Sequence, residues 1–393
     1  MKKLILLYFL FLSNGSIAQL TITGKVINKN TSEAVTGANV FVSNTSYKTV
    51  TNAEGVFVLS NINVQKGELV VNALGYNHST FDINSKTEKG ITISLQQVPK
   101  ELDAVLVKNY DKNGYSKWGR LFNEGFIGSN HSTIDCFIKN TESLKFYYNK
   151  KNHQLSVSAS EPLKIINKAL GYQIDYTLET FEYDTKSNIL FFSGYPVFTE
   201  MQKGKRKMKQ WLLKRNDSYL GSVMHFMRAL YSNKLSEEGF IIQKATKKIN
   251  IQKAAYKKLI AANIEEQRKT NPNAIIRIPL PATEADAELL NQQDSIFEII
   301  SQKLPTDSFA FAIDSVTAGM YFEKYLLISF KKAHENTLVS SFVKLLNPES
   351  LMIFQNGSYY NSMNFFTERY WAENEKIAYL LPLNFVVTKI LKE

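Results

Sequence analysis

Cysteine is almost absent from this sequence: its 393 residues include one, Cys136. A lone cysteine excludes an intramolecular disulfide and a zinc site built from a cysteine cluster. Cys136 lies in the apolar stretch IDCFIKN, so we expect it to be a small buried side chain. A chain of this length without disulfides must fold around ordinary hydrophobic cores.

Long apolar runs are scarce as well. The N-terminal run covers nine residues, 4–12, whereas a membrane-spanning helix needs about 20. Two lysines precede it and a small-x-small triplet (16–18) follows, which predicts a cleaved signal peptide of residues 1–18. We expect the mature chain to begin at Gln19 and not to be a lipoprotein, since no cysteine lies near the cleavage site. No later run of 18 apolar residues is present, so we expect a soluble or peripheral protein, in the periplasm or on the periplasmic face of the outer membrane.

The common catalytic and cofactor motifs are also missing. The sequence contains no H-E-x-x-H, no G-x-S-x-G, no P-loop and no G-x-G-x-x-G. Its five histidines are scattered, with no pair four residues apart: His78, His131, His153, His225 and His334. We therefore expect no metal and no cofactor, with zinc held by distant histidines and glutamates as the remaining alternative.

Charge is strongly biased towards the positive sign. The formal net charge is +11, and removal of the two lysines of the signal peptide leaves 11 − 2 = +9. The densest basic run, KGKRKMKQWLLKR, contains Lys203, Lys205, Arg206, Lys207 and Lys209. One interpretation is contact with an anionic surface, either phospholipid headgroups or lipopolysaccharide phosphates. The other is a solvated loop that leads into a helix. Nucleic acid is not an expected partner, because the chain is expected to be exported.

Residues 20–97 have the pattern of short β-strands. Strands are expected at 20–28, 38–43 and 56–60. In the last of these, Phe57 and Leu59 share one face. Just before it, Asn52 can bond its own backbone and Gly55 can take a positive φ, as a tight reversal requires. Short strands at about 8 to 12 residue intervals predict a β-sandwich.

The motifs of this segment resemble those of a known domain family. They are Gly24-Lys25-Val26, Gly37-Ala38-Asn39-Val40, the stretch TNAEGVF at 51–57, and Gly75-Tyr76. Together they are similar to the carboxypeptidase regulatory-like domain, a transthyretin-like (prealbumin-like) seven-stranded sandwich, over residues 20–97. The resemblance implies an accessory module without catalytic residues, of the kind that lies beside carboxypeptidase domains and ahead of the plugs of outer-membrane transporters. The whole layout is similar to Gram-negative envelope proteins that carry this domain.

The remainder of the chain predicts an α+β domain. After the sandwich (19–98) and a linker (99–116), a helix is expected from Ser116, with the domain running from 117 to 393. Strands are expected at 134–139, 144–149, 154–158, 171–183, 189–192, 325–331, 338–345, 352–359 and 379–385. A helical to mixed section is expected from Lys205 to about residue 302. This pattern predicts a mainly antiparallel sheet with a central helical insertion.

One polar cluster is a candidate site. If residues 221–231 form a helix, Val223, Phe226, Met227 and Leu230 form its apolar face. His225 and Arg228 then lie on another side, and Glu238 follows closely enough to return to them. The functional interpretation is an anion-binding or acid–base group. The structural interpretation is a polar network that holds helix to sheet, and it is the one we favour.

An aromatic-rich segment offers a second candidate. It carries Tyr359, Tyr360, Phe365, Phe366, Tyr370 and Trp371. Aromatic faces can stack on the sugar rings of glycans, but they also fill the core between a sheet and its helices. We favour the core interpretation, because strands of this composition need aromatic packing in any case.

Together these features predict an exported, non-enzymatic binding or assembly protein of the bacterial cell envelope. The sandwich would be its accessory docking module, since an edge strand can accept a partner's strand. The expected partner is an envelope protein or the outer-membrane surface, with glycan as a further alternative; the oligomeric state is left open. The alternative function is a hydrolase acting on envelope glycan or peptide, with His225, Arg228 and Glu238 as its group in the C-terminal domain.

Overall fold

A computed structural model describes residues 20–64, 66–84, 87, 90–98, 110–129, 135–270, 281, 283–332 and 336–388. The expected signal peptide, its cleavage site at Gln19 and residues 99–109 of the expected linker lie outside this part of the chain. The chain divides into two compact units. Unit 1 runs to Leu220 and also includes 354–358 and 374–393, and unit 2 consists of 221–353 and 359–373.

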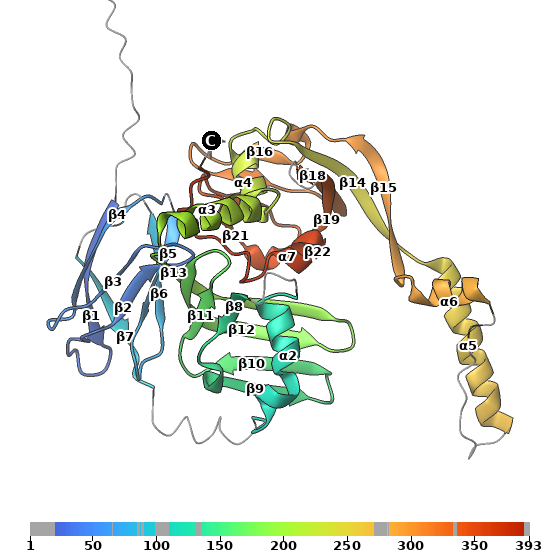
Figure 1. The fold of residues 1–393 in the computed structure, drawn as a ribbon, viewed down its shortest axis with the longest axis horizontal. Coiled ribbons are helices and arrows are strands. Elements are labelled where there is room, and N and C mark those ends of the chain that lie inside the picture. Colours follow the sequence, from blue (N-terminus) through green and yellow to red (C-terminus); the bar gives the residue numbers. More distant parts are fainter. Residues whose placement is uncertain are drawn as a thin grey trace, which may run out of the picture. The chain divides into compact units, whose positions relative to one another are not determined.

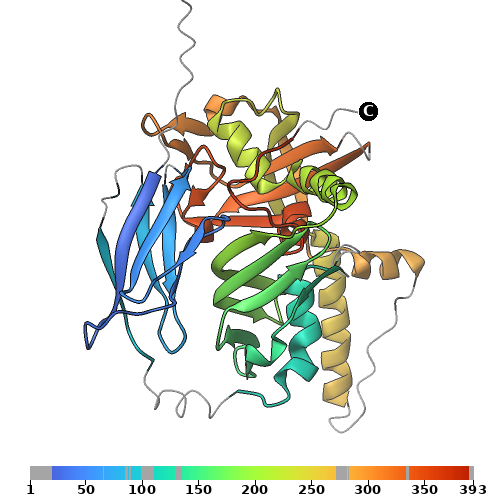
Figure 2. The same cartoon turned by 60° about the vertical axis from the view of Figure 1, so that its left-hand side comes forward.

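The N-terminal sandwich consists of two sheets that pack face to face (Figure 2). The first has the order β4-β1-β7, from β1 (Leu20–Asn28), β4 (Val56–Ile62) and β7 (Ile91–Leu95). The second has the order β3-β2-β5-β6, from β2 (Asn39–Val42), β3 (Lys48–Val50), β5 (Lys66–Asn72) and β6 (Ser79–Asn84). Pairing is antiparallel except between β1 and β7. The alternating residues point inward as expected: Phe57 and Leu59 are buried, whereas Val56 and Val58 are exposed. The predicted sandwich is confirmed.

Turn chemistry fixes how β4 begins. The Asn52 side-chain oxygen accepts hydrogen bonds from the backbone N–H of Glu54 (3.1 Å) and of Val56 (2.8 Å). Gly55 has φ +73°, and a Cβ there would lie 2.5 Å from the carbonyl oxygen of Val26. Only glycine avoids both the strain and the overlap, so the turn that the sequence predicts is the one that forms.

The second part of unit 1 is a six-stranded antiparallel sheet. Its strands are β8 (Cys136–Ile138), β9 (Leu144–Asn149), β10 (Gln154–Ala159), β11 (Leu163–Asn167), β12 (Tyr172–Asp184) and β13 (Ile189–Glu200), in the order β8-β11-β12-β10-β9 with β13 on β12. Helix α2 (Gly114–Phe126) lies on one face of this sheet (Figure 1), where Phe122 contacts Phe146 and Phe181. Cys136 is buried, as expected.

Three expectations for this part need correction. Helix α2 begins at Gly114, two residues before the expected Ser116, because the backbone N–H of Gly114 already bonds the carbonyl of Asp111 (2.8 Å). Strand β11 was not expected, and its pairing with β8 and β12 is what completes the sheet. Strand β13 continues to Glu200, well past the expected 192, because it pairs with β12 along its whole length.

The sandwich docks onto this sheet within unit 1. Phe41 and Val70 from the second sheet of the sandwich pack against Val197 of β13. Backbone hydrogen bonds join the same surfaces, from Phe198 N–H to the carbonyl of Thr45 (2.9 Å) and from Asn44 N–H to that of Pro196. Apolar burial and backbone bonding therefore build the sandwich into the body of unit 1.

Helix α3 (Lys205–Tyr219) ends the first, continuous stretch of unit 1, and the remaining elements follow it. They are α4 (Val223–Tyr231), β14 (Phe240–Ile249), α5 (Ile251–Thr270), α6 (Glu284–Asn291), β15 (Ser295–Lys303), β16 (Ala310–Ala312), β17 (Ala318–Met320), β18 (Tyr325–Lys332), β19 (Thr337–Leu345), β20 (Leu351–Ile353), β21 (Tyr359–Tyr360), β22 (Phe365–Arg369) and α7 (Tyr370–Asn374). Short 3-10 turns lie at Thr141–Ser143, Thr306–Ser308 and Ser362–Asn364. Unit 2 contains two antiparallel sheets, β15-β14-β18-β19-β22 and β16-β17-β20-β21. The expected fold class, a sandwich followed by an α+β arrangement with helices in its middle, is confirmed.

Two further expectations differ from the structure. The strand expected at 352–359 is a hairpin of β20 and β21, because Gly357 takes φ +86° and turns the chain. The strand expected at 379–385 is irregular. Pro382 lacks the N–H that a strand ladder needs, and Leu383 donates its N–H to the carbonyl of Asn44 in the sandwich instead.

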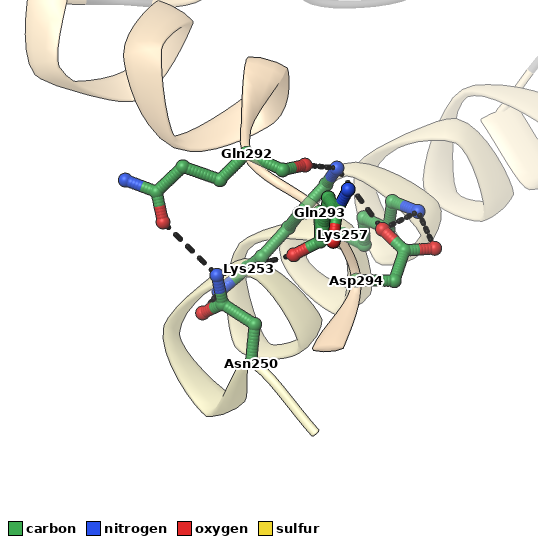
Figure 3. A network of polar contacts seen from close by, with 6 residues as sticks. All are labelled: Asn250, Lys253, Lys257, Gln292, Gln293 and Asp294. Carbon is green, nitrogen blue, oxygen red and sulfur yellow. Dashed lines mark hydrogen bonds and ion pairs between the residues drawn. The ribbon is translucent and has the colours of Figure 1, made fainter. Parts of the chain in front are cut away.

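Strands β14 and β15 continue beyond the sheet of unit 2 as a two-stranded ribbon that carries α5 and α6 at its end (Figure 1). The sequence predicted a helical to mixed section from Lys205 to about residue 302, and β14 and β15 are the strands within it. A polar network joins the ribbon to both helices (Figure 3). Asn250 caps α5 by accepting the N–H of Lys253 (3.1 Å) and donates to the Gln292 side chain (3.0 Å). Asp294 pairs with Lys253 (3.0 Å) and Lys257 (2.8 Å), and hydrogen bonds from these two lysines lower the pKa of its carboxyl group.

Replacement of Asn250 by alanine should loosen both helices. The substitution removes the cap of α5 and the bonds to the chain after α6, and losing such a cap costs about 1 kcal/mol. We expect amide hydrogen exchange in α5 and α6 to become about fivefold faster. Glu265→Gln, which breaks an exposed ion pair with Lys269 on α5, is the matched control and should leave exchange unchanged. Equal exchange in Asn250→Ala and the wild type would show that this network does not hold the helices.

Candidate functional site

The polar cluster of the sequence lies on α4. Ser222 caps the helix, and its hydroxyl oxygen accepts the N–H of His225 (3.1 Å). The apolar residues Val223, Phe226, Met227 and Leu230 are buried. Packing of this face fixes the rotation of α4 and turns His225 towards the chain that follows the helix.

His225 is enclosed, with 2% of its surface exposed. Its Nδ1 accepts the backbone N–H of Gly221 (3.1 Å), and its Nε2 lies 3.4 Å from Oε2 of Glu238. The rings of Phe240 and Phe330 flank the imidazole at centroid distances of 4.8 and 5.3 Å. Because Nδ1 acts as an acceptor, the proton of the neutral ring lies on Nε2 and faces Glu238.

The electrostatics of this cluster favour a neutral imidazole. Burial lowers the pKa of His225, the hydrogen bond and charge of Glu238 oppose this, and the charge of Arg228 adds to the lowering. A general base needs a nitrogen lone pair that is available to the substrate. Here Nδ1 receives a backbone N–H and Nε2 carries the proton, so the geometry suits a structural network better than acid–base chemistry. The structure thus brings His225 and Glu238 together, with Arg228 partly buried one turn further along α4.

The basic run occupies the start of α3. Its five expected contact residues are all exposed: Lys203, Lys205, Arg206, Lys207 and Lys209. Three of them stand in the first turn of the helix, which contains no acidic residue. Backbone N–H groups give a helix N-terminus a partial positive charge, so cations there oppose the helix dipole.

Two buried side chains clamp α3 to the sheet of unit 1. The Arg215 guanidinium donates to the carbonyls of Leu170 (2.7 Å) and Gly171 (3.2 Å), and it pairs with Glu200. The Trp211 ring packs so closely on Gly171 that a Cβ there would lie 2.2 Å from it. Gly171 also has φ +73°. Glycine is therefore required here both by the positive φ and by the lack of space for a Cβ. The cationic turn is therefore presented on a fixed helix.

The aromatic segment contributes two residues to the core of unit 2, whereas Tyr359, Phe366 and Tyr370 are half-buried. Phe365 and Trp371 are buried, and the Trp371 indole donates to the carbonyl of Gly221 (2.8 Å). Tyr360 is more than half exposed. A stacking platform for glycans therefore does not form from Phe365 and Trp371.

Sequence reasoning missed a cavity of about 280 Å³ in unit 1. Strands β2, β3 and β5 of the sandwich form one side, and β11, β12 and β13 form the other, together with Pro162. Asn39 and Asn72 from the sandwich face Asp175 and Thr177 from the sheet. The two sides are about a hundred residues apart in the sequence, and no local spacing connects them.

Neither a metal centre nor a membrane span is found in the described part of the chain. No group of three or more histidine, cysteine, aspartate or glutamate side chains is arranged to hold a metal ion there. Among the same residues, no helix combines the length and the apolar character needed to cross a bilayer.

The N-terminal sandwich is the part of the chain that is similar to a known domain family. No curated protein sequence matches this chain. A solved structure from Bacteroides fragilis, of a protein described as membrane-associated and of unknown function, aligns with 87% of this chain and 99% of its own, at 10% identity and a TM-score of 0.17. A likeness this low supports no argument about fold or function. Residues 22–107, by contrast, match the CarboxypepD_reg-like domain family, so the N-terminal sandwich is a domain of this kind.

Proposed function

We propose that the protein is an exported binding protein of the bacterial cell envelope that attaches to a phosphate-bearing anionic surface through the start of α3. The observation that carries this proposal is the cationic first turn. Lys205, Arg206 and Lys207 stand where acidic residues would stabilise a helix, and each such cation costs about 0.3 to 1 kcal/mol. The clamp of Trp211 and Arg215 offsets that cost, and Lys207 recovers part of it through its Nζ, 5.8 Å from the centre of the Trp211 ring. Helix stability does not explain the choice of Lys205 and Arg206.

The strength of such an attachment follows from the charges. A lysine or arginine near an anionic membrane surface contributes about 1 kcal/mol, so the five exposed cations supply about 5 kcal/mol. That corresponds to an effective dissociation constant of about 0.2 mM. Attachment through α3 alone would be reversible and sensitive to salt.

The sandwich would contribute a docking edge for an envelope protein. One face of its second sheet is occupied by β13 of the same chain. In the described residues β4 lies at the edge of the first sheet and pairs with β1 alone, and its Val58 is 53% exposed. An edge of this kind accepts an extended partner strand. The hydrolase alternative has less support, because both nitrogens of His225 are already engaged.

Vesicle co-sedimentation of the mature chain tests the anionic attachment. The three arms are vesicles of phosphatidylcholine alone, of phosphatidylcholine with phosphatidylglycerol, and of phosphatidylcholine with lipopolysaccharide. We expect binding in one or both anionic arms, which identifies the source of the phosphate, and none to phosphatidylcholine alone. The triple variant Lys205→Glu, Arg206→Glu, Lys207→Glu should bind at least tenfold more weakly.

A charge-matched control makes this test specific. Lys150, Lys151 and Lys186 are exposed in hairpin turns of unit 1, and their replacement by glutamate changes the net charge by the same amount. This variant should keep most of its binding, and raised salt should weaken the wild type. An equal loss in both variants would mean that net charge alone, and not α3, drives attachment.

A further inference from the structure

The cavity between the sandwich and the sheet of unit 1 has the size of a site for a small ligand. Its volume is about 280 Å³. Pockets for drug-sized ligands have volumes of about 300 to 1,000 Å³, so this space suits a single ring with its substituents. Small-molecule sites occur preferentially where two folded modules meet, as they do here.

A chain of polar side chains links the sandwich side of the cavity to the sheet side. The Asn39 amide donates to the side-chain oxygen of Asn72 (3.3 Å), and the Asn72 amide donates to the hydroxyl of Thr177 (3.2 Å). Each amide has two N–H donors, of which these bonds use one, and its oxygen has two lone pairs. This chain therefore offers donors and acceptors side by side, which is what a ligand rich in hydroxyl groups requires.

The charges in the cavity are compatible with a neutral ligand. Lys164 pairs with Asp175 at 3.0 Å, so this cation is already balanced. Lys48 donates to the neutral hydroxyl of Thr199, so its charge remains and the lining carries one more cation than carboxylates. A phosphate or carboxylate would have to approach the Asp175 carboxylate, which repels it, whereas a hydroxyl group can donate to that carboxylate.

An apolar contact between the two sides lies next to these polar groups, because Phe41 is two residues from Asn39 on β2 and Val197 pairs with Asp175. Phe41 and Val197 line the cavity and pack against each other. Sugar rings combine hydroxyl groups at their edge with a face of C–H groups, and an apolar wall buries that face. Polar groups and an apolar patch side by side within one small space thus match a pyranose ring.

We propose that this cavity binds a neutral sugar ring of an envelope glycan. Its hydroxyl groups would bond Asn39, Asn72 and Asp175, and its C–H face would lie against Phe41 and Val197. The site needs both modules, because the sandwich supplies the two amides and the sheet supplies the carboxylate and the threonine hydroxyl. This gives the sandwich a role in recognition, which goes beyond the attachment through α3.

Saturation-transfer NMR and titration of the mature chain test this site. The probes are N-acetylglucosamine and methyl glucoside as neutral sugars, with glucose 6-phosphate as the anionic comparison. We expect the neutral sugars to bind, to compete with each other, and to bind more tightly than the phosphorylated sugar. Asn72→Ala and Asp175→Asn should each weaken binding about tenfold, the equivalent of one lost hydrogen bond of about 1.4 kcal/mol.

Two further variants keep the result interpretable. Val50 is 54% exposed and lines the cavity, so Val50→Trp should block it without removing a buried polar group. Asn152→Ala, in the exposed turn between β9 and β10, should bind sugar like the wild type. The triple glutamate variant of α3 should also keep sugar binding, so failure of the surface proposal and failure of this one are distinguishable. Absence of neutral-sugar binding, preference for the phosphorylated sugar, or unchanged binding in Val50→Trp would overturn the proposal.

Discussion

Replacement of His225 by alanine is expected to lower the free energy of unfolding of unit 2 by about 3 kcal/mol. The side chain is 2% exposed and packs between Phe240 and Phe330, so its loss leaves a cavity. The backbone N–H of Gly221 also loses its acceptor, and an unpaired buried donor costs about 1 to 3 kcal/mol. Urea unfolding followed by circular dichroism measures the loss, and hydrogen exchange of α4 locates it.

His225→Asn is the matched variant, because its side-chain oxygen can still accept the N–H of Gly221. We expect it to recover about half of the lost stability. If His225→Ala instead kept its stability while a hydrolase activity on envelope glycan or peptide disappeared, the structural role would be wrong and the catalytic group of His225, Arg228 and Glu238 would regain support.

The lowered pKa of His225 predicts that the stability of unit 2 depends on pH. The pKa of this histidine in the folded protein is lowered from the ordinary 6.5, mainly by burial. Above pH 6.5 the ring is neutral in both the folded and unfolded chain, so its contribution to stability is complete. As the pH falls below 6.5 the unfolded chain binds a proton first, and stability is lost. Wild-type unit 2 should therefore lose stability between pH 7 and pH 5 more steeply than His225→Asn, as urea titrations at both pH values would show.

Replacement of Trp211 by alanine should cost unit 1 about 4 kcal/mol. Its ring is 2% exposed, lies on Gly171, and donates from Nε1 to the carbonyl of Lys168 (2.8 Å). The substitution removes a large buried surface and leaves that carbonyl without its donor. Thermal or urea unfolding provides the measurement, and faster hydrogen exchange in α3 is the expected local signature.

Gly171→Ala disturbs the contact between the Trp211 ring and Gly171 by adding a Cβ instead of removing the ring. The added Cβ would overlap the Trp211 ring at 2.2 Å, and φ +73° strains any residue with a side chain, so we expect a loss of about 3 kcal/mol. Leu213→Ala, at a half-exposed position of α3, is the control and should change stability by about 0.5 kcal/mol or less. Similar stabilities for Trp211→Ala and Leu213→Ala would show that the clamp does not hold α3.

Local chemistry accounts for the parts of the fold that were predicted. Alternation at Phe57 and Leu59, with a turn that needs Asn52 and Gly55, is sufficient to specify β4 and its reversal. The helix at α4 follows in the same way from its apolar spacing. These patterns involve neighbours within a few residues, so the chain reveals them without its tertiary structure.

The elements that were missed depend on distant partners. Strand β11 exists because β8 and β12 lie on either side of it. The segment at 379–385 looks like a strand, yet Leu383 bonds Asn44 more than three hundred residues away. An isolated pattern cannot show which edge of a sheet will be available to a segment.

The candidate sites also differ in whether they depend on local sequence or on contacts between distant segments. The sequence by itself determined the sandwich, the basic start of α3 and the polar spacing of α4, because each depends on residue type and local period. Only the tertiary structure decided that both nitrogens of His225 are engaged, and that Asn39 and Asn72 meet Asp175 and Thr177 around one cavity. The physical reason is that these contacts arise when faces far apart in the chain are buried together, and burial of a whole face is not encoded at any single position.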